Sequence, residues 1–160
     1  MSLVVCDTTP LNYLILIGNI DVLPRLFDRL LVPPAVIREM QHRNAPPPVV
    51  AWTANLPPWI EIKAPRTDLH LNIGAGEDEA ISLAVELGNI ALLVDDSRAR
   101  AAATSRGLII FGTLAILNQA DAAGLLDFDA ALSRLRATNF RLDDTAVDPI
   151  VAQVRARKQR

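Results

Sequence analysis

The chain has 160 residues, of which 51% are hydrophobic and 21% charged, and its formal net charge is −2. This composition is typical of a packed globular protein of about one domain and excludes a disordered chain. The small negative charge gives no overall attraction for nucleic acid, although an acidic site that binds a divalent cation cancels its own charge locally.

Three sequence features bear on location and chemistry. No run approaches the roughly 18 apolar residues needed to cross a bilayer, and no basic segment followed by an apolar one opens the chain. We therefore expect a cytoplasmic protein with no membrane association. Cys6 is the only cysteine, which excludes an internal disulfide and a multi-cysteine zinc site.

Short apolar strands alternate with helices along the chain. In chain order the pattern predicts strand 3–6, helix 9–18, a short helix from 19 or 21 to 27, strand 30–32, helix 35–41, loop 43–48, helix 49–56, strand 59–62, irregular 63–73, helix 76–87, strand 90–94, helix 97–106, strand 108–111, helix 113–123, and helices 127–138 and 144–157. Strands that are apolar along their whole length indicate an α/β fold with a parallel sheet covered on both faces. We expect one domain over 1–160, with a helical C-terminal extension from about 126 to 160.

Acidic residues follow two of the predicted strands. Asp7 comes directly after the first strand, and Asp95 and Asp96 follow the strand 90–94. Ligand sites of open parallel sheets lie beyond the carboxyl ends of the strands. The pair Thr9–Pro10 can start the following helix by itself, which leaves Asp7 free for another task. Read alone, however, the stretch VVCDTTP also fits a simple helix cap.

The helix that begins GEDEAISLA carries three acids in its first turn. Glu77 lies three and four residues before Ala80 and Ile81, so it shares their apolar face and should point towards the sheet. Favourable interaction with the helix dipole is enough to explain Asp78 and Glu79, and Glu79 is expected to be solvated. It does not explain why Glu77 is on the buried side.

Two other acidic positions are ambiguous when taken alone. Glu39, in VPPAVIREMQ, could equally be an exposed glutamate, and one of Asp95 and Asp96 could cap the next helix, since neighbours on an extended chain face opposite ways. Together with Asp7 and Glu77 they make a carboxylate cluster plausible. Clustered carboxylates repel one another unless a cation is present, and oxygen ligands suit Mg²⁺ or Mn²⁺. Such sites perform metal-assisted phosphodiester hydrolysis.

Several segments carry a family resemblance. In order, DTTPLNYL, VPPAVIREM, GAGEDEAISLA, LLVDDSRARAAATSRGL and FGTLAIL resemble the PIN-domain nucleases, in particular the DUF3368-type PIN-like branch akin to the VapC toxins. The resemblance extends through LSRLRATNFRLDD. It implies a PIN-like three-layer α/β/α fold with a central parallel sheet and extra C-terminal helices. It also implies a Mg²⁺- or Mn²⁺-dependent endoribonuclease, acting on RNA, that forms a homodimer and is neutralised by a cognate antitoxin.

The resemblance assigns roles residue by residue. The four catalytic acids are expected to be Asp7, Glu39, Glu77 and Asp96, with Asp95 as the alternative or accessory fourth acid. The metal ligands would come from Asp7, Glu77, Asp95 and Asp96, and Thr9 would be an accessory hydroxyl. The third acid, Glu77, departs from the aspartate that is common in the toxins.

The sequence supports two readings at each of two points. Arg98 and Arg100 follow the fourth acid on one helix and could contact RNA phosphates, although a solvated helix face explains them as well. The competing function is a catalytically weak PIN-like protein that binds nucleic acid or regulates. A phosphoacceptor receiver domain needs a lysine just after its last strand to pair with the phosphoryl group, and it is excluded because the only lysines, Lys63 and Lys158, lie in a loop and in the tail.

Overall fold

Five parallel strands form a single sheet in the computed structural model, which describes residues 2–160; Met1, the first residue of the expected domain, lies outside the described residues. The sheet order is β3-β2-β1-β4-β5. Its strands are β1 (Leu3–Cys6), β2 (Arg29–Val32), β3 (Ile60–Ile62), β4 (Ala91–Leu93) and β5 (Ile110–Phe111). The predicted α/β class with a parallel sheet is confirmed.

Helices connect the strands and complete the chain. They are α1 (Thr8–Leu16), a 3₁₀ turn at Ile20–Val22, α2 (Leu23–Leu26), α3 (Pro34–Met40), α4 (Pro47–Ala54), α5 (Ala75–Glu86), α6 (Ser97–Thr104), α7 (Thr113–Ala122), α8 (Phe128–Arg136) and α9 (Asp144–Lys158). Over residues 2–160 none of these helices combines the length and the apolar character that crossing a membrane requires.

Some element boundaries differ from those predicted. Helix α4 begins at Pro47, inside the predicted loop 43–48, because proline is well accommodated in the first helical turn, where its missing N–H is not needed. Helix α1 begins at Thr8 rather than Thr9. Strands β4 and β5 are shorter than predicted: Val94 and Leu108 are buried but lie outside the strands, so their apolar character reflects core packing.

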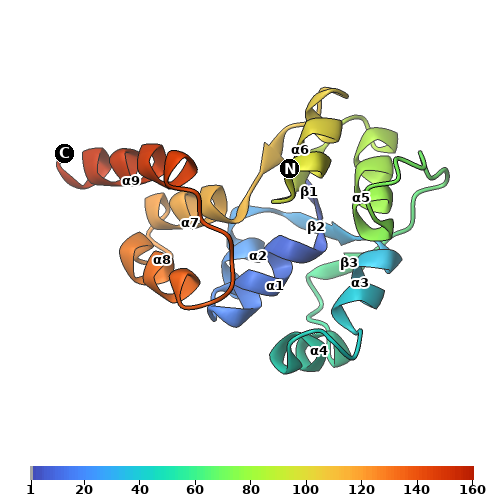
Figure 1. Cartoon of the computed structure of the whole chain (residues 1–160), viewed down its shortest axis with the longest axis horizontal. Coiled ribbons are helices and arrows are strands. Elements are labelled where there is room, and N and C mark those ends of the chain that lie inside the picture. The colour runs from blue at the N-terminus through green and yellow to red at the C-terminus, as the bar shows by residue number, and fades with distance from the viewer. Residues whose placement is uncertain (1) are drawn as a thin grey trace.

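The sheet has a core on each face. Along β1, Val4 and Cys6 face one core while Val5 faces the other, as the two-residue period of a strand requires. Helices α1, α2, α7 and α8 lie on the first side of the sheet, whereas α5 and α6 lie on the second (Figure 1). This is the three-layer α/β/α arrangement that the resemblance implied.

The chain changes direction in the sheet between β1 and β4. Strand β1 pairs with β2 on one side and with β4 on the other, and the helices that leave β1 and β4 go to opposite faces. The carboxyl ends of these two strands therefore border a crevice, which is the usual ligand position in open α/β sheets. Asp7 follows β1 and Asp95 follows β4 at this point.

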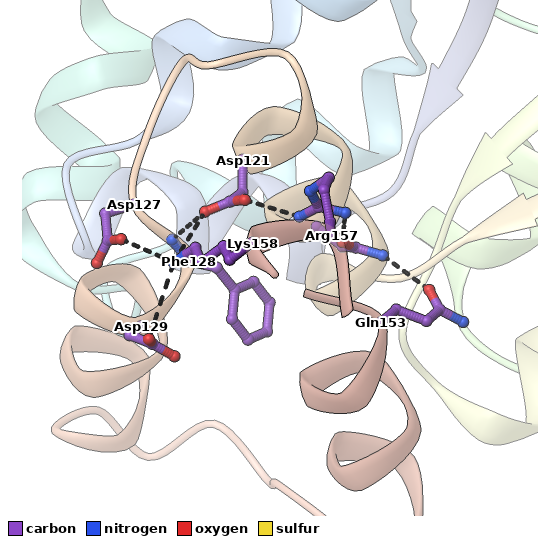
Figure 2. A network of polar contacts seen from close by, with 8 residues as sticks. Asp121, Asp127, Phe128, Asp129, Gln153, Arg157 and Lys158 are labelled. Carbon is purple, nitrogen blue, oxygen red and sulfur yellow. Dashed lines mark hydrogen bonds and ion pairs between the residues drawn. The ribbon is translucent and has the colours of Figure 1, made fainter. Parts of the chain in front are cut away.

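A polar network fastens the end of α9 to the turn between α7 and α8 (Figure 2). The Asp121 side chain is only 8% exposed, and its carboxylate accepts hydrogen bonds from Arg157 (2.7 Å) and from the backbone N–H of Phe128 (2.8 Å). Lys158 lies 3.1 Å from Asp127 and 3.8 Å from Asp121. These contacts join the C-terminal extension to the rest of the fold.

Replacing Asp121 tests this network. Asp121→Asn keeps the shape but removes the charge that Arg157 and Lys158 face, and hydrogen bonds to charged groups contribute about 1.5–3 kcal/mol each. We expect the free energy of unfolding, measured by urea denaturation at neutral pH, to fall by roughly that amount. The matched control is Asp129→Asn, since Asp129 is 67% exposed and lies 3.9 Å from Lys158; it should change stability by less than about 1 kcal/mol. Equal effects from both substitutions would contradict this account.

The same network should depend on pH. Burial raises the pKa of Asp121, but the hydrogen bonds from Arg157 and Phe128 and the charge of Lys158 outweigh it and lower the pKa below its usual range. A carboxyl with a lowered folded pKa stabilises the protein above its unfolded pKa of about 3.9, and this contribution is lost as pH falls through the folded value. The stability difference between the wild type and Asp121→Asn should therefore shrink below about pH 4, as measured by thermal unfolding across pH.

Candidate functional site

Asp7 is a buried carboxylate without a partner. It follows β1, its side chain has no solvent exposure, and neither carboxylate oxygen has a hydrogen-bond partner among the described residues. Its backbone N–H donates to the carbonyl of Leu93 at the end of β4 (3.0 Å). Asp7 occupies the N-cap position of α1, yet its side chain accepts no capping hydrogen bond. A polar group buried in this way is costly and rare, so it calls for an explanation in terms of function.

Other acids surround Asp7. Burial raises the pKa of Asp7 well above its usual range, and the negative charge of Glu77 adds to the shift. The nearby backbone N–H of Thr8, which is not aligned for a hydrogen bond to the carboxylate, opposes the shift only in part, and the charges of Glu39 and Asp95 raise the pKa further. These carboxylates come from different elements, namely α3, α5 and the end of β4. The fold therefore brings them into one electrostatic neighbourhood.

Glu39 is held firmly in this neighbourhood. It lies half-buried in the last turn of α3, and its carboxylate accepts hydrogen bonds from the Thr8 hydroxyl (2.5 Å) and from the backbone N–H of Gly76 (3.0 Å). Gly76 is in the first turn of α5, where backbone N–H groups are free to bind an anion. Glu39 is thus positioned by a side chain that follows β1 and by the N-terminus of another helix.

Two glycines make room for the carboxylates. A Cβ atom on Gly76 would lie 2.7 and 2.8 Å from the two carboxylate oxygens of Glu39. A Cβ atom on Gly74 would collide with Oε2 of Glu77, and Gly74 also has a φ of +128°, which side chains rarely adopt. The glycines of the GAGE stretch therefore let two glutamates approach the start of α5.

Glu77 is half-buried, as its place on the apolar face of α5 predicted. Burial raises its pKa, its own backbone N–H opposes the shift, and the charges of Glu39 and Asp96 raise the pKa further. Glu77 is therefore within the field of acids from both sides of the crevice.

The prediction for Glu79 is wrong. This side chain is only 19% exposed, accepts a hydrogen bond from the backbone N–H of Ala35 (3.0 Å) and lies 3.7 Å from Arg38, so it caps α3. Asp78 likewise has more than a dipole role: it is buried and accepts hydrogen bonds from the backbone N–H groups of Asn72 and Ile73. Helix α5 packs against α3 and the preceding loop as well as the sheet, which its own periodicity cannot reveal.

Asp95 and Asp96 point in different directions. The largely buried Asp95 accepts hydrogen bonds from the Thr113 backbone N–H (2.8 Å) and hydroxyl (2.6 Å); burial raises its pKa, while Thr113 and the charge of Arg100 oppose the rise. Asp96 is exposed and caps α6 by accepting from the backbone N–H of Ala99 (2.9 Å). Of these two residues, Asp95 is the one whose charge raises the pKa of Asp7.

The remaining predicted residues divide between cavity and surface. Thr9 and Arg100 line a cavity of about 1010 Å³, together with Asp95 and Asp96. Arg98 is exposed and makes only a long contact (3.5 Å) with the carbonyl of Asn72. The structure thus places Arg100 next to the acids and Arg98 outside the cavity.

Sequence reasoning missed three residues that position the acids: Thr8, Gly76 and Thr113. Thr8 lies beside the candidate Thr9 in the DTTP stretch. The sequence shows both hydroxyl groups but does not show which of them faces the acids. Thr113 lies two residues after a predicted strand, a position equivalent to that of Thr8, and this placement was a usable signal. Gly76 could be identified only once Glu39 was known to approach α5.

The residues at this site are chemically suited to bind a divalent cation, but as positioned they do not form a complete coordination sphere. Over residues 2–160, no group of three or more His, Cys, Asp or Glu side chains is close enough together to hold an ion as the side chains stand. The fit comes from Asp7, whose two unpaired oxygens have no other partner, and from the oxygen-only character of its neighbours. Asp7, Glu77, Asp95 and Asp96 are the carboxylates that could hold such an ion.

Comparison with known proteins identifies the family. The model of the family described as DUF3368, PIN domain, matches residues 3–156, so this chain belongs to the PIN domain family. No curated protein matches the chain. Membership of this family indicates a nuclease-type function with a nucleic-acid substrate, and PIN domains generally use divalent metal ions.

Removing the Asp7 charge should stabilise the metal-free protein. A carboxyl whose folded pKa is raised destabilises the fold increasingly as pH rises from its unfolded pKa of about 3.9 to the folded value, and the full cost remains above that. Asp7→Asn should therefore raise the free energy of unfolding by about 1 kcal/mol or more at neutral pH in chelator. Adding Mg²⁺ or Mn²⁺ should raise the melting temperature of the wild type but not of Asp7→Asn. A wild type that is more stable than the variant in chelator would contradict the assignment.

Gly76→Ala tests the position of Glu39 separately from folding. The new methyl group must displace the Glu39 carboxylate, whereas alanine is favoured over glycine in a helix by about 1 kcal/mol. We expect unchanged or higher thermal stability together with a weaker metal-induced rise in melting temperature. Glu39→Gln serves as the comparison, because it alters the same carboxylate without adding bulk. A Gly76→Ala protein that responds to metal like the wild type would contradict this role for Gly76.

Proposed function

We propose that the protein is a Mg²⁺- or Mn²⁺-dependent endoribonuclease that hydrolyses RNA phosphodiester bonds. The observation that carries the proposal is the buried, unpaired Asp7 carboxylate, surrounded by other acids, at the strand-order reversal of a PIN domain. Stability does not explain such a group, whereas cation binding does.

The acids differ in whether their carboxylate oxygens already accept hydrogen bonds. Asp7, with no hydrogen-bond partner, is the principal ligand. Among the acids whose charges act on it, Glu77 has the largest effect, followed by Glu39 and Asp95, and Asp96 is accessory at the cap of α6. We assign the fourth acid to Asp95 because it is partly buried after β4, the strand that pairs with β1, whereas Asp96 is exposed and engaged as the cap of α6. A divalent cation held there would offset the carboxylate charges, lower the pKa of a water molecule and polarise the phosphate.

Glu39 and Glu77 have different tasks in this proposal. Glu39, fixed by Thr8 and Gly76, orients water or substrate without moving. Glu77 is only half-buried and burial raises its pKa, so it is a better proton acceptor for the attacking water than an ordinary exposed carboxylate.

The biological setting is also a proposal. The resemblance to the branch akin to VapC toxins supports a toxin component of a toxin–antitoxin pair, working in the cytoplasm as a homodimer and blocked by a cognate antitoxin. A single domain with a helical extension is consistent with α8 and α9, which pack on α7.

A second candidate function is a catalytically weak PIN-like protein that binds nucleic acid or regulates. The observation that favours it is that, within residues 2–160, the acids do not approach one another closely enough to hold an ion without rearrangement. The two candidates differ in turnover and not in substrate class.

Cleavage of RNA by the pure protein distinguishes them. Single-stranded and structured RNAs are incubated with Mg²⁺, Mn²⁺ or chelator, and products are resolved by gel electrophoresis. The wild type should cleave only with metal, and Asp7→Asn should lose more than the roughly 10–100-fold typical of changes around a metal site. Asp21→Asn is the matched control, because Asp21 is exposed beyond the far end of α1 and should behave as the wild type. Equal inertness of wild type and Asp7→Asn towards all RNAs would refute the nuclease proposal and favour the binding protein.

A further inference from the structure

The C-terminal extension builds a cavity next to the acids. The cavity, of about 1010 Å³, lies between α1, the start of α6, the segment 139–143 that links α8 to α9, and the first half of α9. Its volume is at the upper end of ordinary ligand pockets. Asp95 and Asp96 form part of its wall, so it is continuous with the candidate active site. Its far wall consists of residues that the acidic site does not use.

Two aromatic rings line this cavity. Tyr13 of α1 and Phe140 of the linking segment meet edge to face, with ring centroids 4.8 Å apart. The Tyr13 hydroxyl donates to Asn139 (2.7 Å), which ties the segment to α1. Burial and the charge of Asp95 raise the pKa of Tyr13, so its ring lies within the field of the acidic site. The rings therefore offer an apolar surface close to the reacting position.

Positive charge in the cavity is available to a ligand. Arg100 and Arg141 both line it, and neither forms an ion pair within residues 2–160. Arg100 lies beside Asp95 above Gly112, where a Cβ atom would be 3.2 Å from its Nη1. The nearby Asp143 carboxylate is already engaged, since it accepts a hydrogen bond from the Thr145 backbone N–H (3.0 Å). Unpaired guanidinium groups are well suited to bind phosphate.

We propose that this cavity is the subsite for a nucleotide flanking the cleaved bond of single-stranded RNA, with its base against Tyr13 and Phe140 and a phosphate at Arg100 and Arg141. This inference rests on the proposed function and specifies its substrate as single-stranded RNA. Only an unpaired nucleotide can place its base against protein rings, because the bases of a duplex are stacked on one another.

Contacts at both ends hold the C-terminal extension in place. At one end Tyr13 binds Asn139, and at the other Arg157 binds Asp121 in the network that fastens α9 to α7 (Figure 2). The linking segment thus forms a fixed wall of the cavity. A preformed wall lowers the entropy cost of ordering an RNA strand there.

Binding by a cleavage-silenced protein tests the subsite. In the Asp7→Asn background, a fluorescein-labelled single-stranded RNA of about 12 nucleotides is titrated and followed by anisotropy. Adding Arg141→Gln should weaken binding severalfold and reduce the slope of log affinity against log salt by about 1, as loss of one phosphate contact does. Arg136→Gln is the matched control, because Arg136 is an exposed arginine of α8 that does not line the cavity.

The aromatic wall needs its own variants. Phe140→Ala should weaken binding roughly 5- to 150-fold, the effect expected for one stacked base. Because Phe140 also packs against the core, the melting temperature of the Phe140→Ala protein is measured as well. Tyr13→Phe keeps the ring but removes the bond that ties Asn139 to α1, so it should weaken binding less than Phe140→Ala does. Duplex RNA of the same sequence should compete poorly.

The outcomes separate this inference from the proposed function. If the wild type cleaves RNA with metal but Arg141→Gln and Phe140→Ala bind as the parent does, the subsite is refuted and the nuclease stands. If the wild type never cleaves, yet both variants lose single-stranded RNA binding and Arg136→Gln does not, the subsite stands and the nuclease fails. No binding by the parent, or equal competition by duplex RNA, overturns the subsite.

Discussion

The buried carboxylate of Asp7, with no donor to satisfy it, is the constraint around which this fold is arranged. It follows the central strand β1, whose neighbours β2 and β4 close both sides of it, so water cannot reach it freely. An unsatisfied buried charge costs more than most single interactions contribute, and a proton or a cation is the only simple compensation. The negative charges of the nearby acids disfavour ionisation of Asp7 and favour binding of a cation beside it.

Three of the neighbouring acids, Glu39, Asp95 and Asp96, are each held by a specific group, which distinguishes them from Asp7. Thr8 and the α5 N-terminus hold Glu39, Thr113 holds Asp95, and the start of α6 holds Asp96. These donors prevent the carboxylates from drifting apart into solvent, although they repel one another. The acids at the crevice lower the stability of the fold. Burial of the two apolar cores, one on each face of the sheet, offsets this loss.

The C-terminal extension gives this crevice its second wall. Helices α8 and α9 pack on α7, and the linking segment between them passes close to α1 (Figure 1). Its aromatic and basic residues lie next to carboxylates, so one continuous cavity carries acidic chemistry at one end and phosphate- and base-binding groups at the other. An active site and a recognition surface can thus be combined although the chain as a whole has a slightly negative charge.

Local patterns in the sequence determined the strands, the helices, the parallel sheet and the acids that follow its strands, because hydrophobic period and helix-stop glycines act over a few residues. They also placed Glu77 on a buried face. The choice of Asp95 over Asp96 as the acid that acts on Asp7, the contact of Thr8 with Glu39, and the capping of α3 by Glu79 needed the tertiary structure. So did the cavity, since Tyr13 and Asn139 are 126 residues apart in the chain. Such contacts depend on how separate elements pack, and no local period records which side chains will meet there.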